Sequence, residues 1–103
     1  MNARESVSQI VDEWASHHGV RLSCHVRGFP QEHCFAYVSN GLGECCQIVV
    51  EALTQGVVTV RVMEIESIGN DQLSGVWRVT ASELATTLNT ATTLVERWLA
   101  RLP

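Results

Sequence analysis

The middle of the chain alternates between apolar and polar side chains, and this period of two residues is the strongest constraint on its fold. The stretch VRLSCHVR, residues 20–27, has an apolar residue at every second position. Successive side chains of a strand point to opposite faces of a sheet, so the pattern predicts a half-buried strand. Four more strands are expected at residues 33–39, 45–53, 57–65 and 73–79, with short glycine-containing segments between them. Because parallel neighbours need long crossovers, these short connections predict an antiparallel meander.

Both ends of the chain change to a helical period. Residues 4–18 are predicted to form a helix, because one stripe at helical spacing runs along them: Val7, Ile10, Val11, Trp14 and His18. Residues 80–83, TASE, have capping-box spacing, and a second stripe follows at Leu84, Leu88, Ala91, Val95, Trp98 and Leu102. The chain of 103 residues is therefore predicted to be one α+β domain, residues 1–103, in the order α-β-β-β-β-β-α. Both helices are expected on one face of a five-stranded antiparallel sheet, which leaves the other face open.

Cysteine and histidine side chains in the segment SCHVRGFPQEHCF raise the question of a metal site. Cys24 adjoins His25, and His33 adjoins Cys34. Adjacent side chains of a strand point to opposite faces, so neither pair is expected to bind one ion, and the same holds for the cysteines at 45–46. We expect Cys24 and Cys34 to be reduced and to face the core, with the two histidines facing outward across the hairpin. No metal and no cofactor are predicted, and a metal- or thiol-dependent protein is the third alternative considered.

The charge distribution disfavours a nucleic-acid partner. The net charge is −4, and all seven basic residues are arginines that form no basic cluster in the sequence. The segment between residues 41 and 75 contains only one basic residue, Arg61, and five acidic residues: Glu44, Glu51, Glu64, Glu66 and Asp71. Such a segment favours a basic protein partner, and a solvated sheet edge is the alternative. The five acidic residues are therefore predicted to form a partner-binding surface.

Two aromatic residues are expected to contribute apolar anchors to this surface. Alternation in residues 33–39 places Phe35 and Tyr37 on the face opposite the helices. Exposed aromatic side chains in a cluster are a plausible contact surface for a protein partner. The alternative is that a loop or helix covers them.

No feature of the sequence predicts a membrane span, a secretion signal or a catalytic site. No apolar run approaches the roughly 20 residues that a membrane helix needs. The stretch MNARESVSQIVDEW carries acidic residues and has no apolar signal region, so a cytoplasmic location is expected. Common signatures such as G-x-S-x-G, the P-loop and H-E-x-x-H are missing from the sequence. A binding protein is therefore predicted rather than an enzyme.

The layout resembles that of small bacterial immunity proteins of contact-dependent and related polymorphic toxin systems. Many of these place a helix before a strand meander and end in a helix, and the stretch VWRVTASELATTLNTATTLVERWLARL resembles such an ending. The resemblance implies tight neutralisation of a cognate toxin, through a complex that often covers the toxin's active site with acidic residues. It implies no shared functional residues.

Small acidic type III secretion chaperones offer the second alternative. The ending TLVERWLARLP is similar to their last helix. The predicted elements lack the internal helix between strands that usually helps such chaperones to dimerise. The resemblance to immunity proteins therefore ranks first.

Overall fold

The computed structural model describes residues 3–19, 22–24, 33–51, 54–68 and 72–101; of residues 3–6, 8, 22–24, 33 and 35 only the backbone is described. The elements in chain order are α1 (Ala3–His18), β1 (Leu22–Cys24), β2 (His33–Ser39), β3 (Cys45–Glu51), β4 (Val58–Glu66), β5 (Ser74–Val79), the 3-10 turn η1 (Ala81–Glu83) and α2 (Leu84–Leu99).

The sheet is an antiparallel meander in the order β1-β2-β3-β4-β5. It consists of four long strands and β1, which is described over Leu22–Cys24; the other residues of the strand predicted at 20–27 lie outside the described residues. The register runs straight across the centre, where Phe35 pairs with Val49, Val49 with Arg61, and Arg61 with Val76. The predicted α+β class with an antiparallel sheet and two helices is confirmed.

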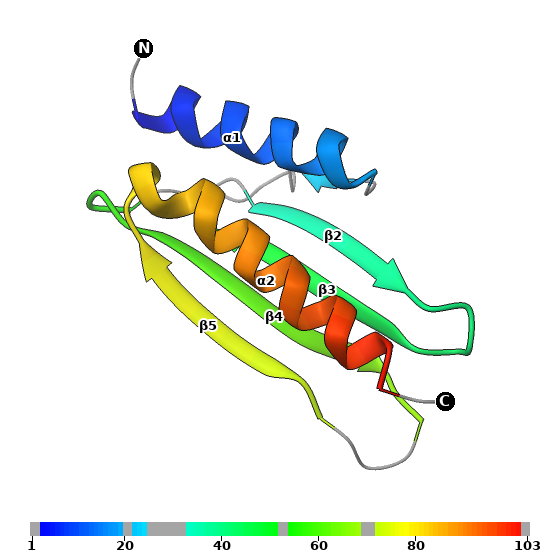
Figure 1. Ribbon diagram of the computed structural model, residues 1–103. Coiled ribbons are helices and arrows are strands. Elements are labelled where there is room, and N and C mark those ends of the chain that lie inside the picture. Colours follow the sequence, from blue (N-terminus) through cyan, green and yellow to red (C-terminus); the bar gives the residue numbers. More distant parts are fainter. Residues whose placement is uncertain (1–2, 20–21, 25–32, 52–53, 69–71, 102–103) are drawn as a thin grey trace.

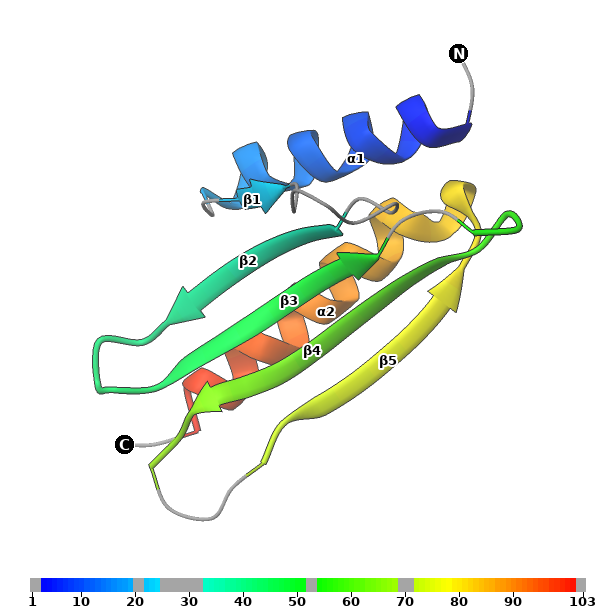
Figure 2. The same ribbon diagram turned by 180° about the vertical axis from the view of Figure 1, so that it is seen from behind.

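Both helices lie on one side of the sheet. In Figure 1 α2 runs in front of β3 and β4, and in Figure 2, from behind, the sheet lies in front of α2. Alternate residues of β3 and β4 point toward α2, so Ile48, Val60 and Val62 are almost fully buried. They pack in one core with Leu88 and Val95 of α2. The opposite face of the sheet carries no helix among the described residues.

A buried hydrogen bond joins the two helices. Trp14 Nε1 of α1 donates to Thr92 Oγ1 of α2 at 2.8 Å, and both side chains are buried. The Thr92 hydroxyl in turn donates to the Leu88 carbonyl at 2.8 Å. A threonine is a weak helix former, but here its hydroxyl satisfies a buried indole N–H that would otherwise lack a partner. The pair therefore fixes the position of α1 against α2.

The start of α2 follows the predicted capping signal. The backbone N–H of Thr80 donates to the Glu83 carboxylate at 3.1 Å. That bond and the Thr80 hydroxyl lower the pKa of Glu83. The 3-10 turn Ala81–Glu83 then leads directly into α2. The local sequence thus sets where the chain leaves β5 and turns back over the sheet.

Candidate functional site

A buried ion pair closes the end of the sheet where the β2–β3 turn, the segment after β4 and the end of α2 meet. Glu44 is 1% exposed, and its two carboxylate oxygens accept hydrogen bonds from the Arg101 guanidinium at 3.1 and 2.7 Å. Asn40 Nδ2 donates to the same carboxylate at 2.9 Å, and the backbone N–H of Ile68 donates at 3.1 Å. The Arg101 guanidinium also lies 3.8 Å from the centroid of the Trp98 ring. These three segments are held together through one carboxylate.

These contacts correct the prediction for Glu44. The side chain was predicted to belong to an acidic contact surface, but it is buried and fully occupied by partners within the chain. The hydrogen bond from Arg101 is the main reason why its pKa lies below the ordinary value, and burial opposes that effect. Glu44 therefore stabilises the fold. Asp71, predicted for the same surface, lies outside the described residues.

The remaining predicted acids do not gather on one face. Glu51 lies on the open face with its Oε1 3.4 Å from Nε of Arg61. Glu64 points to the helix side and accepts a 2.6 Å hydrogen bond from the backbone N–H of Leu73. Glu66 is exposed at the end of β4. Of the described acids in this set, only Glu66 is exposed, so the continuous acidic surface is not formed by them.

The open face instead carries an apolar patch. Tyr37, Ile65 and Val76 are 53%, 48% and 49% exposed. The half-buried Met63 lies two residues before Ile65 on the same face of β4, and Gln47, the Cα partner of both Met63 and Tyr37, separates these two residues. We call Tyr37, Met63, Ile65 and Val76 the open-face patch. Its exposed apolar side chains are the kind of surface that proteins use to contact partners.

Polar neighbours hold this patch in place. Gln47 Nε2 donates to the Tyr37 hydroxyl at 3.0 Å, which orients the ring. The backbone of Phe35 pairs with Val49, which places Phe35 on the same face as Tyr37; its side chain lies outside the described set.

Nε of Arg61 is buried and has no hydrogen bond, although the Glu51 carboxylate is 3.4 Å away. At that distance the pair contributes attraction without a well-formed hydrogen bond.

Two further exposed apolar residues lie at one end of the sheet. Leu42 in the β2–β3 turn is 55% exposed, and Ile68 after β4 is 48% exposed. The backbone N–H of Leu42 donates to Asn40 Oδ1 at 2.9 Å, while that of Ile68 donates to Glu44. Asn40 and Glu44 are themselves hydrogen-bonded, so the buried cluster holds both loops and presents both side chains. Sequence analysis missed these residues because a single apolar residue in a turn carries no periodic signal.

The cysteines correct another prediction. Cys34 is disulfide-bonded, so the expectation that Cys24 and Cys34 are reduced is wrong for Cys34. Its Cα partner across β1 and β2 is Cys24. Cys45 and Cys46 are free thiols, and burial raises the pKa of Cys46 to about 11. A thiol with so high a pKa is a poor nucleophile at neutral pH.

The predicted outward histidines are only partly described. His25 lies outside the described residues, and of His33 the backbone alone is described, in β2. The suggestion that their rings face each other therefore stays a prediction. Among the side chains that the structure describes, no group of three His, Cys, Asp or Glu residues could hold a metal ion.

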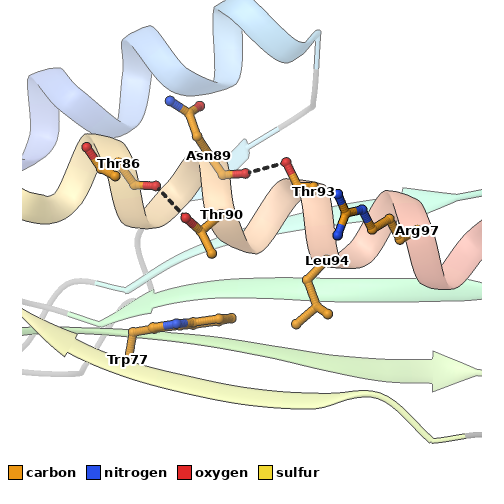
Figure 3. A pocket seen from close by; sticks show the side chains of 7 residues that line it. All are labelled: Trp77, Thr86, Asn89, Thr90, Thr93, Leu94 and Arg97. Atoms are coloured by element: carbon orange, nitrogen blue, oxygen red, sulfur yellow. Dashed lines mark hydrogen bonds between the residues drawn. The ribbon is translucent and has the colours of Figure 1, made fainter.

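A groove on the helix side lies between α2 and the edge strand β5 (Figure 3). It has a volume of about 440 Å³. The indole of Trp77 lies beneath the helix as its floor, and Leu94 points down toward that ring. Thr90 and Arg97 of α2 complete the helix side. The groove is on the opposite side of the sheet from the open-face patch.

Comparisons with protein-family models, with curated proteins and with solved structures found no match. In the part of the chain that the structure describes, no helix combines the length and the apolar character that a membrane crossing needs.

Proposed function

We propose that the protein is a protein-binding immunity protein, which neutralises a cognate bacterial toxin by covering it with the open face of its sheet. The observation that carries the proposal is the open-face patch, with Tyr37, Ile65 and Val76 about half exposed on a face that no helix of the described residues covers. Exposed aromatic and aliphatic side chains on a rigid sheet lose little conformational entropy when a partner covers them.

The size of this face indicates where else the partner makes contact. Four strands about 4.8 Å apart and about six residues long project an area of roughly 400 Å². A stable complex usually buries about 800 Å² on each partner. The partner is therefore expected to reach beyond the strands to Leu42 and Ile68 at the end of the sheet.

The charges suggest a basic surface on the partner at that same end. Glu66 is exposed at the end of β4, beside Ile65 in the sequence. The chain carries a net charge of −4, which raises the association rate with a basic toxin domain. Glu66 is expected to act at the rim of the interface, while Tyr37 and Ile65 supply the apolar centre.

The test uses the product of the neighbouring gene, which the proposal expects to encode a toxic domain. Bacteria that produce this domain are expected to grow only when the chain is co-produced, and the two purified proteins should form a complex measurable by calorimetry. Ile65→Asp should weaken the complex at least about 100-fold, because a charge replaces a central apolar contact. Val57→Asp is the matched control, since Val57 is also exposed but lies at the opposite end of the sheet.

Glu66→Lys tests the expected charge of the partner. Charge reversal at the rim should lower the association rate and weaken its dependence on salt, with a smaller effect on dissociation. Glu64 is a poor choice for this experiment because its carboxylate binds the Leu73 backbone. Binding that is unchanged by both Ile65→Asp and Glu66→Lys would reject the open face as the interface. No growth protection and no complex would reject the immunity function.

A further inference from the structure

The edge strand β5 combines unpaired backbone groups with an adjacent apolar groove. β5 is last in the strand order, so in the described part of the chain no strand pairs with its outer side. The Leu73 carbonyl accepts a hydrogen bond from the backbone N–H of Glu64 in β4, so the backbone polar groups of Leu73 point toward β4. In an antiparallel strand this direction alternates. The backbone groups of Ser74, Val76 and Arg78 therefore point outward, away from β4.

The floor of the groove depends on a glycine in β5. The indole of Trp77 folds back over Gly75, and a Cβ at Gly75 would lie 2.9 Å from Trp77 Cη2 and 3.0 Å from Val62 Cγ2. The absence of a side chain at Gly75 thus lets the ring lie flat along the strand. A flat aromatic ring beside Leu94 forms an apolar surface that a large side chain can cover (Figure 3).

The positive charge at the groove indicates which side chains a bound segment should carry. Arg97 is the one charged residue among the described residues that line it, and Arg97 has no ion pair with a described residue. Arg78 is also exposed, but it shares the open face with Val76 and does not line the groove. The guanidinium of Arg97 therefore favours an acidic side chain at the groove, although the chain as a whole carries a net charge of −4.

We propose that an extended segment of a partner protein adds to β5 as a sixth strand. Its backbone pairs with the outward groups of Ser74, Val76 and Arg78, and one large apolar side chain enters the groove against Trp77. An acidic side chain of the same segment pairs with Arg97. Strand addition of this kind takes affinity from main-chain hydrogen bonds and specificity from alternate side chains. The groove lies on the opposite side of the sheet from the open-face patch, and Val76 alone belongs to both: its side chain to the patch and its backbone to the edge. The proposal stands independently of the immunity function.

The test begins with a displayed library of random nine-residue peptides, selected on the immobilised full chain. Enriched peptides should carry an aromatic or large aliphatic residue and an acidic residue separated by an even number of positions, so that both side chains point to the groove side. The best peptide is then synthesised, and its Kd is measured by fluorescence anisotropy. Val76→Pro should raise the Kd at least about tenfold, because proline removes one outward N–H and disturbs no bond to β4. Val76→Ala, which retains the N–H, is the matched control.

Two further variants test the groove and the charge. Thr90→Phe fills the groove from the helix side and should raise the Kd at least about tenfold, whereas Thr90→Ala should leave it within about twofold. Arg97→Glu should weaken binding of the peptide, and exchange of the peptide's acidic residue for arginine should restore the affinity. If Val76→Pro lowers the helical and strand content measured by circular dichroism, the Thr90 and Arg97 variants decide the question.

Three outcomes would overturn the proposal. The first is a library without enriched sequences, and the second is peptides that bind Val76→Pro and Thr90→Phe as tightly as the parent. The third is a dimer of this chain that Val76→Pro dissociates, because a second copy would then be the occupant of the edge. None of these outcomes depends on Ile65 or Glu66, so failure here is distinct from failure of the immunity function.

Discussion

The Arg101 guanidinium donates to both carboxylate oxygens of Glu44, at 3.1 and 2.7 Å, across 57 residues of sequence. The carboxylate is buried, whereas the side chain of Arg101 is 20% exposed. A buried carboxylate that loses its partner keeps the cost of leaving water and gains nothing in return. The stability of the fold should therefore depend on this pair much more than on an exposed ion pair.

The first prediction follows from that asymmetry. Arg101→Met should lower the Tm by roughly 10 °C or more, because it leaves the Glu44 carboxylate buried without its cation. Adding Glu44→Gln should recover part of this loss, since a neutral amide is cheaper to bury. Arg97→Met, in the last turn of α2, is the control, and its Tm should stay within about 3 °C of the parent. Equal effects of Arg101→Met and Arg97→Met in thermal melts would contradict the structural role of the pair.

The second prediction concerns acid. The folded state holds the pKa of Glu44 below the ordinary value of 4.5, chiefly through the hydrogen bond from Arg101. The folded protein therefore binds this proton less readily than the unfolded chain. The associated stabilisation is fully present above about pH 4.5 and is lost as the pH falls through the lowered pKa. Urea unfolding between pH 3 and 7 should show a steeper loss of stability in the parent than in Glu44→Gln.

The third prediction concerns the bond between Trp14 and Thr92. Thr92→Val keeps the side-chain shape but removes the acceptor of the 2.8 Å hydrogen bond from the buried indole. The unpaired indole N–H should lower the free energy of unfolding by about 1–3 kcal/mol. Thr93→Val, at an exposed neighbouring position, should change it by less than about 0.5 kcal/mol. If the loss at Thr92 persists undiminished in a Trp14→Phe background, the bond is not its cause.

Periodicity predicted the elements of this fold well because each depends on neighbours close in sequence. The alternation of Val58, Val60 and Val62 and the stripe of Leu84 and Leu88 both report which side faces the core, and all five residues are buried. The TASE capping signal likewise marks the turn into the last helix. Of the strand predicted at residues 20–27, the described residues Leu22–Cys24 do form a strand.

The candidate site was harder to predict because its contacts are distant in sequence. Glu44 looks like any acidic residue in a turn, and its burial depends on Arg101 at the far end of the chain. Composition groups Glu44, Glu51 and Glu64, but the fold directs them into the interior, to the open face and to the helix side. The groove at β5 has no signal in the periodicity, since it arises where α2 leaves Trp77 partly uncovered.

The fourth prediction concerns the thiols. Cys46 is 0% exposed and burial raises its pKa to about 11, so its thiolate is scarce at pH 8. Native protein treated with iodoacetamide should be modified at Cys45, and Cys46 should react only after unfolding. Peptide mass spectrometry locates the label, and Cys45→Ser should abolish native labelling. Cys34 should resist labelling until a reductant is added, because it is disulfide-bonded. Native labelling of Cys46 at the rate of Cys45 would contradict its burial.

The fifth prediction uses Gly75, where an added Cβ would lie 2.9 Å from the Trp77 ring. In an open strand, replacing glycine by alanine usually stabilises, because the unfolded chain loses freedom. Here the ring must move away from the strand, and Gly75→Ala should instead lower the free energy of unfolding by about 1–2 kcal/mol. Adding Trp77→Leu removes the ring and leaves only the 3.0 Å approach to Val62 Cγ2, so in that background Gly75→Ala should cost clearly less. Urea titrations of the four proteins in this cycle measure the difference, and an equal loss in both backgrounds would show that the indole does not lie over Gly75.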